Sequence, residues 1–318
     1  MYDLSKIKQL IQYFRSNYQN YGDIFGISTK LPNINDFFPT GGCGETAIFI
    51  SNEYIINAWR EAVLESFVSN HIEHPSRSDY ETSVANSILI NRAKKNVDDI
   101  VNLCRVIHEL SRLYLQDAEL MVYPRTLGLE LLLYGYEEAF YEMNKDLVDT
   151  INESAPKYLL VHDPAELYSL VELDRKYGIK TTIINFLDYL LDHISIDREV
   201  KVDYKIIFQE SCILERWIKG VNIFDKLKKF FGDNIVRHPL GGELTICCGE
   251  FMWLLEPIIS INNASERLAS LIHFGGNNIA VACPRSLYIF RVASRRNKGF
   301  EDAKIMDIVE LIYKIMVK

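Results

Sequence analysis

The fold is decided by a stretch that occurs twice, VHDPAELYSLVELDRKYGIKTTIINFLDYLLDHI at residues 161–194 and VACPRSLYIFRVASRRNKGFEDAKIMDIVELIYKI at residues 281–315. Each copy reads as an apolar strand, a turn containing proline, a helix, a short strand and an amphipathic helix. With one residue inserted, four positions are identical: Val161, Pro164, Leu167 and Tyr168 match Val281, Pro284, Leu287 and Tyr288. A supersecondary unit repeated in the same order indicates an internal duplication.

Outward from this repeat, strand-like and helical stretches alternate along the chain. Short apolar runs predict strands at 46–50, 119–123, 158–161, 180–184, 204–208, 234–237, 244–247, 279–282 and 304–306. Apolar residues at helical spacing predict helices at 53–69, 83–115, 129–151, 165–177, 186–194, 221–231, 263–274, 286–295 and 308–317. This alternation predicts an α/β fold with largely parallel sheets.

The length of 318 residues allows two domains, each with its own core. We expect an N-terminal helix and lead-in over residues 1–40. A first Rossmann-like α/β domain without metal is expected over residues 41–198, and a second, metal-binding copy over residues 199–318.

The composition and charge of the chain argue against several classes of function. The chain is 48% hydrophobic and 25% charged, which is typical of a globular protein. A net charge of −8 argues against nucleic-acid binding. There is no apolar run of membrane-spanning length, and the first residues, MYDLSKIKQLIQYF, predict an amphipathic helix and not a secretory signal. We therefore expect a cytoplasmic protein.

The distribution of the six cysteines is the first functional clue. Cys43 and Cys104 stand alone and are interpreted as buried structural residues. The other four all lie beyond residue 211: Cys212, Cys247, Cys248 and Cys283. In a reducing compartment, clustered cysteines more often bind metal or perform redox chemistry than form disulfides.

The spacing of these four cysteines predicts one common site. The interval from Cys212 to Cys247 is 35 positions, and the interval from Cys248 to Cys283 is the same. Each group follows a predicted strand, and ligands of parallel sheets collect at the carboxyl ends of the strands. Two adjacent cysteines can share a site only if the chain turns, which Gly249 permits.

Two other interpretations of the cysteines stay open at this point. The four could be buried structural cysteines, which are common in protein cores. They could also hold zinc, because four thiolates satisfy a closed tetrahedral site.

The motifs QESC, ICCGEFMW and ACPRS resemble the cysteine-rich CCG domain. This domain occurs in heterodisulfide reductase subunits B and D and in the iron–sulfur subunits of glycolate oxidase and anaerobic glycerol-3-phosphate dehydrogenase. The likeness runs from about residue 15 to the C-terminus and is strongest after residue 200. It implies an iron–sulfur cluster held by Cys212, Cys247, Cys248 and Cys283, with electron transfer as the function.

The chain departs from the family pattern at three places. Ser286 stands where the motif Cys-Pro-x-Cys has its last cysteine, so an ordinary [4Fe–4S] cluster or zinc is expected, with the Ser286 oxygen as an optional weaker ligand. The first half carries FISNEY, VYPRTLG and HDPAE where the thiols would be. Ferredoxin-like cysteine motifs are missing from the chain, so a flavoprotein or ferredoxin-like partner subunit is expected to supply electrons.

The sequence therefore predicts one of two functions. The first is an electron-transfer subunit of a heterodisulfide-reductase-like or flavin-linked dehydrogenase complex, acting as an oxidoreductase only within that complex and passing electrons to a disulfide, a sulfur compound or a quinone. The second is a non-catalytic scaffold or membrane-anchoring subunit, with zinc or no metal in the site. Both allow peripheral association with the inner face of a membrane.

Several other polar residues are interpreted structurally. His162 and His238 lie near predicted strand ends, where ordinary packing is preferred to a role at the site. Asp163 and Glu166 are expected to be solvated or to cap a helix. A basic run follows residue 290 and is expected to be a solvated face or a docking site for an acidic partner: Arg291, Arg295, Arg296 and Lys298. The final helix, 308–317, is expected to pack on the sheet.

Overall fold

The computed structural model describes residues 4–39, 44–194, 202–218 and 221–317. These residues form two four-stranded sheets in which every strand pair is parallel. The first sheet has the order β2-β1-β3-β4 and the second the order β6-β5-β7-β8. The strands are β1 (Thr46–Ser51), β2 (Ala118–Tyr123), β3 (Tyr158–Val161), β4 (Thr182–Asn185), β5 (Ile206–Gln209), β6 (Ile235–Arg237), β7 (Asn278–Val281) and β8 (Lys304–Asp307).

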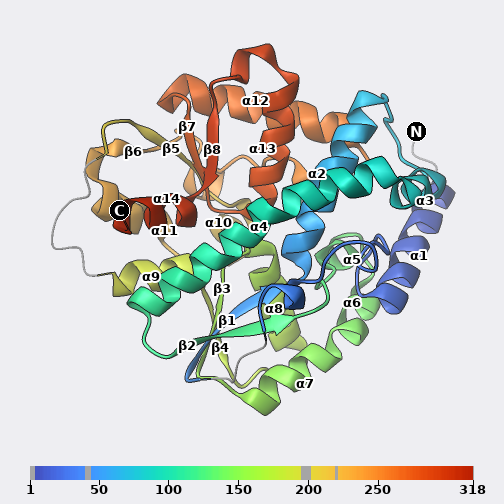
Figure 1. The fold of residues 1–318 in the computed structure, drawn as a ribbon, viewed down its shortest axis with the longest axis horizontal. Coiled ribbons are helices and arrows are strands. Elements are labelled where there is room, and N and C mark those ends of the chain that lie inside the picture. Colours follow the sequence, from blue (N-terminus) through green and yellow to red (C-terminus); the bar gives the residue numbers. More distant parts are fainter. Residues whose placement is uncertain (1–3, 40–43, 195–201, 219–220, 318) are drawn as a thin grey trace.

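Helices fill the connections and cover the sheets (Figure 1). They are α1 (Leu4–Tyr21), α2 (Glu53–Ser69), α3 (Arg77–Ala85), α4 (Ser87–Tyr114), α5 (Leu129–Leu133), α6 (Glu137–Met143), α7 (Lys145–Ser154), α8 (Pro164–Tyr177), α9 (Phe186–His193), α10 (Cys212–Arg216), α11 (Ile223–Phe231), α12 (Pro257–Gly275), α13 (Pro284–Arg296) and α14 (Ile308–Met316). The predicted α/β fold, with two Rossmann-like units after a helical N-terminus, is confirmed. None of the helices in the described ranges is both long and apolar enough to cross a membrane.

The duplicated stretch has the same architecture in both copies. The order β3-α8-β4-α9 in the first copy becomes β7-α13-β8-α14 in the second. Pro164 and Pro284 each occupy the first turn of the helix that follows the central strand, where a missing backbone N–H costs nothing. Asp163 and Cys283 are therefore equivalent helix-capping positions, as the alignment predicted.

Two long predicted helices are divided in the structure. The helix predicted at 83–115 breaks at Asn86, whose extended backbone and side-chain oxygen cap the start of α4. The helix predicted at 129–151 becomes α5, α6 and α7, with breaks at Gly135, which has φ of +81°, and at Asn144. Apolar periodicity continued across these breaks, so it did not reveal them.

The strand predicted at 244–247 is wrong. Leu244 ends a short 3-10 helix, and residues 245–248 are irregular. The carbonyl oxygen of Thr245 accepts a hydrogen bond from Arg216, and that of Ile246 accepts one from the Gln209 side chain at 3.3 Å. Side chains thus satisfy backbone groups that a strand neighbour would otherwise bond, so no ladder forms here.

The two halves pack closely together. Helix α2 of the first half packs against α12 and α13 of the second, and α4 packs against α14. In Figure 1 the long α4 crosses between the lower first half and the upper second half. The carboxyl ends of β3 and β8 meet at His162, whose Nε2 lies 3.1 Å from Asp307 Oδ2. The predicted domain boundaries at 40/41 and 198/199 lie outside the described residues.

Candidate metal centre

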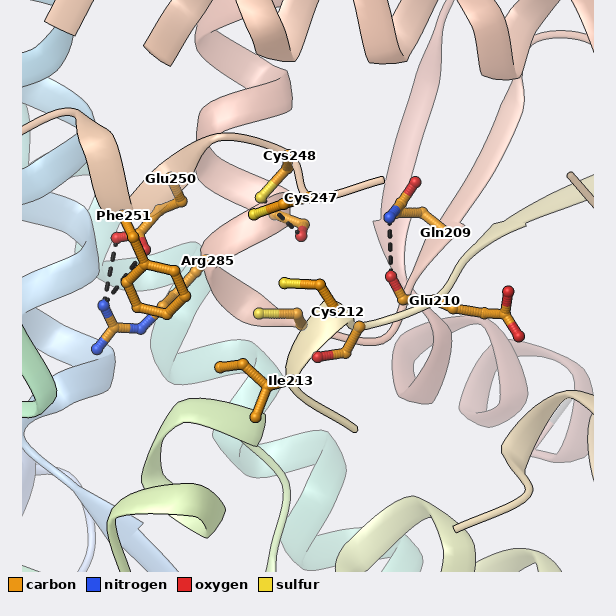
Figure 2. Close-up of a pocket in the computed structure, with 12 residues that line it drawn as sticks. Gln209, Glu210, Cys212, Ile213, Cys247, Cys248, Glu250, Phe251 and Arg285 are labelled. Atoms are coloured by element: carbon orange, nitrogen blue, oxygen red, sulfur yellow. Dashed lines mark hydrogen bonds and ion pairs between the residues drawn. The ribbon is translucent and has the colours of Figure 1, made fainter. Parts of the chain in front are cut away.

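The four late cysteines line one pocket, and all of its lining residues belong to the second half. Cys212 begins α10 just after β5, and Cys283 precedes α13 just after β7. Cys247 and Cys248 come from the irregular segment that crosses the end of β5. Figure 2 shows the side chains of Cys212, Cys247 and Cys248 gathered around the same space. The four cysteines predicted to share a site thus line the same pocket, although the Cys247–Cys248 pair does not reach it from a strand.

The topology explains why these positions meet. Strand β5 pairs with β6 on one side and with β7 on the other, so the strand order reverses between β5 and β7. Loops that leave two such strands diverge and open a crevice at their carboxyl ends. Cys212 and Cys283 sit on these two loops, at the switch point of the second sheet.

The cysteine doublet turns at Gly249. This residue has φ of +87°, a conformation that residues with a Cβ rarely adopt. A Cβ added here would also lie 3.1 Å from the carbonyl oxygen of Ser260 and from Cβ of Asn263. Ser260 Oγ donates a hydrogen bond to the Gly249 carbonyl at 2.8 Å, which anchors the turn to α12. The predicted role of Gly249 is confirmed.

The thiols interact electrostatically with one another. Hydrogen bonds from the thiols of Cys212 and Cys248 lower the pKa of Cys247 to about 3, helped by the Gly249 N–H, 3.4 Å from the Cys247 sulfur. The same contacts with Cys247, together with burial, raise the pKa of Cys212 and Cys248. Burial raises the pKa of Cys283. These contacts favour the thiolate form at Cys247 over the other three positions.

The space between these side chains is small. The cavity that they enclose has a volume of about 10 Å³, near the smallest that can hold one water molecule. In the described part of the chain, no three His, Cys, Asp or Glu side chains stand in an arrangement that could hold one metal ion.

Ser286 lies inside the same pocket and is buried. Its Oγ lies 3.2 Å from the sulfur of Cys248 and donates a hydrogen bond to it. The serine that stands at the last position of the ACPRS motif thus contacts the Cys248 thiol directly.

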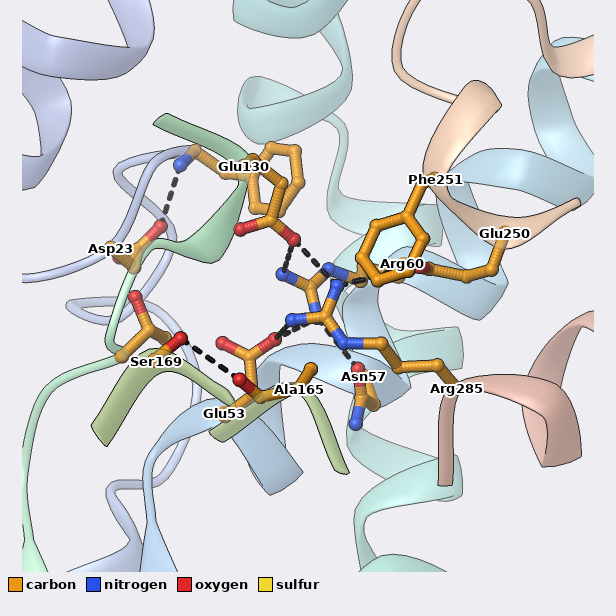
Figure 3. Close-up of polar contacts among 12 residues, drawn as sticks. Asp23, Glu53, Asn57, Arg60, Glu130, Ala165, Ser169, Glu250, Phe251 and Arg285 are labelled. Carbon is orange, nitrogen blue, oxygen red and sulfur yellow. Dashed lines mark hydrogen bonds and ion pairs between the residues drawn. The ribbon is translucent and has the colours of Figure 1, made fainter. Parts of the chain in front are cut away.

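A buried charge network borders the thiols. Arg60 and Arg285 lie between Glu53, Glu130 and Glu250, and every one of these side chains is at most 5% exposed (Figure 3). Arg285 pairs with Glu130 at 2.7 Å and with Glu250 at 3.3 Å. Arg285 and Glu250 also line the thiol pocket. Because Arg60, Glu53 and Glu130 come from the first half, the network joins both halves beside the candidate centre.

The first half carries carboxyl groups where the second carries a thiol and a hydroxyl. Asp163 caps α8 by accepting a hydrogen bond from the Ala165 N–H at 2.8 Å, and Glu166 accepts one from Ser51. Asp163 is a capping residue as predicted, but both carboxyl groups are buried and not solvated. Burial raises the pKa of both, and the Asp163 charge adds to the rise at Glu166.

Other predicted residues have structural partners. His238 is buried, and its ring nitrogens contact Ser270 and Arg267. Cys104 is fully buried in α4, as predicted, whereas Cys43 lies outside the described residues. Three arginines of the basic run contact the first half: Arg291 with Asp99, Arg295 with Glu61 and Glu65, and Arg296 with Ser69. The final helix packs against β7, β8 and α4.

The sequence interpretation overlooked the charged residues around the thiols. Glu250 and Arg285 are within two positions of predicted ligands, and this adjacency is a usable signal. Arg267 lies on the buried, apolar face of α12, between Ala264 and Leu268. A lone arginine at such a position indicates a buried charge that needs a partner.

Comparison with known proteins finds no match: no family model fits the chain, and no curated protein or solved structure is similar to it. The CCG-domain likeness therefore stays a prediction carried by the motifs.

Proposed function

We propose that this chain is the iron–sulfur electron-transfer subunit of a heterodisulfide-reductase-like or flavin-linked dehydrogenase complex. The observation that carries this proposal is the meeting of four thiols from three segments at the switch point of the second sheet. Thiolates are soft ligands that suit iron–sulfur clusters. When bound, such a cluster accepts and releases single electrons.

The chemistry of the four thiols suits an iron–sulfur cluster. Cys212, Cys247, Cys248 and Cys283 would hold it, and Ser286 would donate a hydrogen bond to a ligating sulfur. The lowered pKa of Cys247 supplies one thiolate before any metal arrives. The other three thiols must lose their protons on binding, so uptake of metal is expected to strengthen as pH rises.

The surrounding residues would tune the site. The network around Arg60 and Arg285 carries three carboxylates against two guanidinium groups, which leaves one excess negative charge near the thiols. Negative charge opposes the arrival of an electron and favours a low reduction potential. The Ser286 hydroxyl acts in the opposite direction, because hydrogen bonds to the sulfurs stabilise the reduced state.

Substitution of one ligand in the purified anaerobic complex tests the proposal. Cys248→Ser is expected to remove iron and abolish electron transfer while the complex still assembles. Cys104→Ala removes a buried thiol far along the chain and is the matched control, expected to keep both iron and turnover. Unchanged turnover in Cys248→Ser, or stoichiometric zinc in place of iron, would favour the scaffold function instead.

A further inference from the structure

A second cavity opens beside the thiol pocket. It has a volume of about 630 Å³, in the range of small-molecule binding sites. Cys247 and Phe251 line both cavities, and Gly249 lines the larger one, so the larger cavity lies beside the cysteine doublet. Unlike the space between the thiols, this cavity has room for a ligand without rearrangement.

Arg267 lines this cavity and is 2% exposed. Its Nε donates to Gln209 Oε1 at 2.7 Å, and one terminal nitrogen lies 3.1 Å from His238 Nδ1. Its other terminal nitrogen, Nη2, is buried and has no hydrogen-bonding partner among the described residues.

The contacts of Arg267 leave its charge unpaired. His238 Nδ1 also accepts the Leu240 N–H at 3.0 Å, so this nitrogen carries no proton, and Nε2 donates to Ser270. The imidazole is therefore neutral, as is the Gln209 amide. The nearby Glu210 is held by Arg237 and by the Gly242 N–H. No carboxylate in the described part of the chain forms an ion pair with Arg267, and a buried unpaired charge is costly.

The remaining lining has a cationic and an apolar part. Arg216 is exposed, and it donates a hydrogen bond to the neutral carbonyl of Thr245. Ile246 and Met252 are 42% and 41% exposed, high for apolar side chains that line a cavity. Glu266 is the one acidic residue among the lining residues and is exposed.

We propose that this cavity binds a small organic anion, whose carboxylate, phosphate or sulfonate group is held by Arg267 and Arg216 and whose apolar part lies against Ile246 and Met252. The anion would neutralise the charge of Arg267, and a turn of this side chain toward the cavity would bring the unbonded Nη2 to it. Its role as the molecule that exchanges electrons at the thiol site rests on the proposed function, whereas its binding does not.

Calorimetric titration of the anaerobic full chain with benzoate, phenyl phosphate, benzenesulfonate and neutral benzamide tests this inference. We expect at least one anion to bind at least tenfold more tightly than benzamide, and the comparison among the three identifies the preferred oxyanion. Arg267→Gln and Arg216→Gln should each weaken that anion about tenfold or more, because each removes a charged hydrogen bond. Glu266→Gln should tighten it.

Controls separate binding from folding and from the metal. Arg216 and Glu266 are exposed, so their variants stay informative if Arg267→Gln does not fold. Arg175→Gln, an exposed arginine on α8, should leave the dissociation constant unchanged. Equal affinity for benzamide and the anions, or unchanged affinity in both Arg216→Gln and Arg267→Gln, would overturn the inference. Iron content measured on the same samples reports the proposed function separately, and Cys248→Ser should still bind the anion.

Discussion

The hydroxyl of Ser286 lies 3.2 Å from the sulfur of Cys248 and donates a hydrogen bond to it. In the CCG-domain motif that the sequence resembles, this position is a cysteine, and here a hydrogen-bond donor stands in its place. The structure gives Ser286 a definite role in the thiol site that does not require it to be a ligand.

Ser286→Ala should therefore keep its metal but change its potential. Loss of the hydrogen bond raises the electron density on the Cys248 sulfur, which lowers the reduction potential. About 1 kcal/mol for one hydrogen bond corresponds to a shift of about 40 mV for one electron. A redox titration followed by EPR measures it, with Ser294→Ala on the same helix as the control. Loss of iron in Ser286→Ala would instead make the oxygen a ligand.

Glu166→Gln should stabilise the protein at neutral and higher pH. Burial and the Asp163 charge raise the pKa of Glu166 well above its ordinary value near 4.5. The folded state then keeps a proton that the unfolded chain releases, so stability falls as pH rises from the unfolded to the folded pKa. Above the folded pKa, the free energy of unfolding is lower by about 1.4 kcal/mol for each unit by which folding raises the pKa of Glu166.

Melting temperatures recorded between about pH 4 and pH 9 check this expectation. The advantage of Glu166→Gln over the parent should be absent at the acid end and grow with pH. Glu45→Gln, at an exposed ion pair with Lys157, should show no such trend. A variant that melts below the parent at every pH would show that Glu166 is charged in the folded protein.

Arg285→Leu should strongly destabilise the contact between the halves. It leaves the three carboxylates of the network with Arg60 alone, and removal of one partner from a buried network costs about 3–5 kcal/mol. Urea unfolding measures the loss. Arg175→Leu breaks an exposed pair with Glu172 and should cost less than about 1 kcal/mol. Equal small losses in both variants would show that the network adds nothing to stability.

Gly249→Ala should perturb the cysteine doublet more than a comparable change elsewhere. Gly249 and Gly276 have nearly equal φ values of +87° and +86°, but only Gly249 has neighbours within 4 Å of an added Cβ. The positive φ makes both substitutions destabilising by about 1 kcal/mol. Gly249→Ala must also move the turn, so it alone should lower the iron content. Full iron in Gly249→Ala would show that the turn tolerates displacement.

Much of the fold could be predicted because its signals are local. The bounds of α2 and β3 were predicted to the residue, since each is a single apolar pattern with a clear start and end. The repeat alone predicts that Asp163 and Cys283 occupy equivalent positions, and both precede the first turn of a helix. The strand at 244–247 was predicted wrongly because its backbone groups bond to the side chains of Arg216 and Gln209, which no local pattern reveals.

The cysteines of the candidate site could be predicted from local patterns, but the charged residues around them could not. Cys212 and Cys283 were placed correctly because they follow neighbouring parallel strands. The ion pair between Glu53 and Arg285 spans 232 positions, so its existence depends on how the halves pack. The unpaired charge of Arg267 likewise depends on which groups α12 faces in the folded molecule. Such pairings are set by tertiary structure and leave no local pattern in the sequence.

The most direct test is elemental analysis combined with EPR on the chain purified without oxygen. If the thiols of Cys212, Cys247, Cys248 and Cys283 hold a cluster, the protein should contain about four iron atoms per chain and give an EPR signal on reduction. Protein that is fully folded yet contains no iron, or contains one zinc per chain, would contradict the assignment of this site to electron transfer.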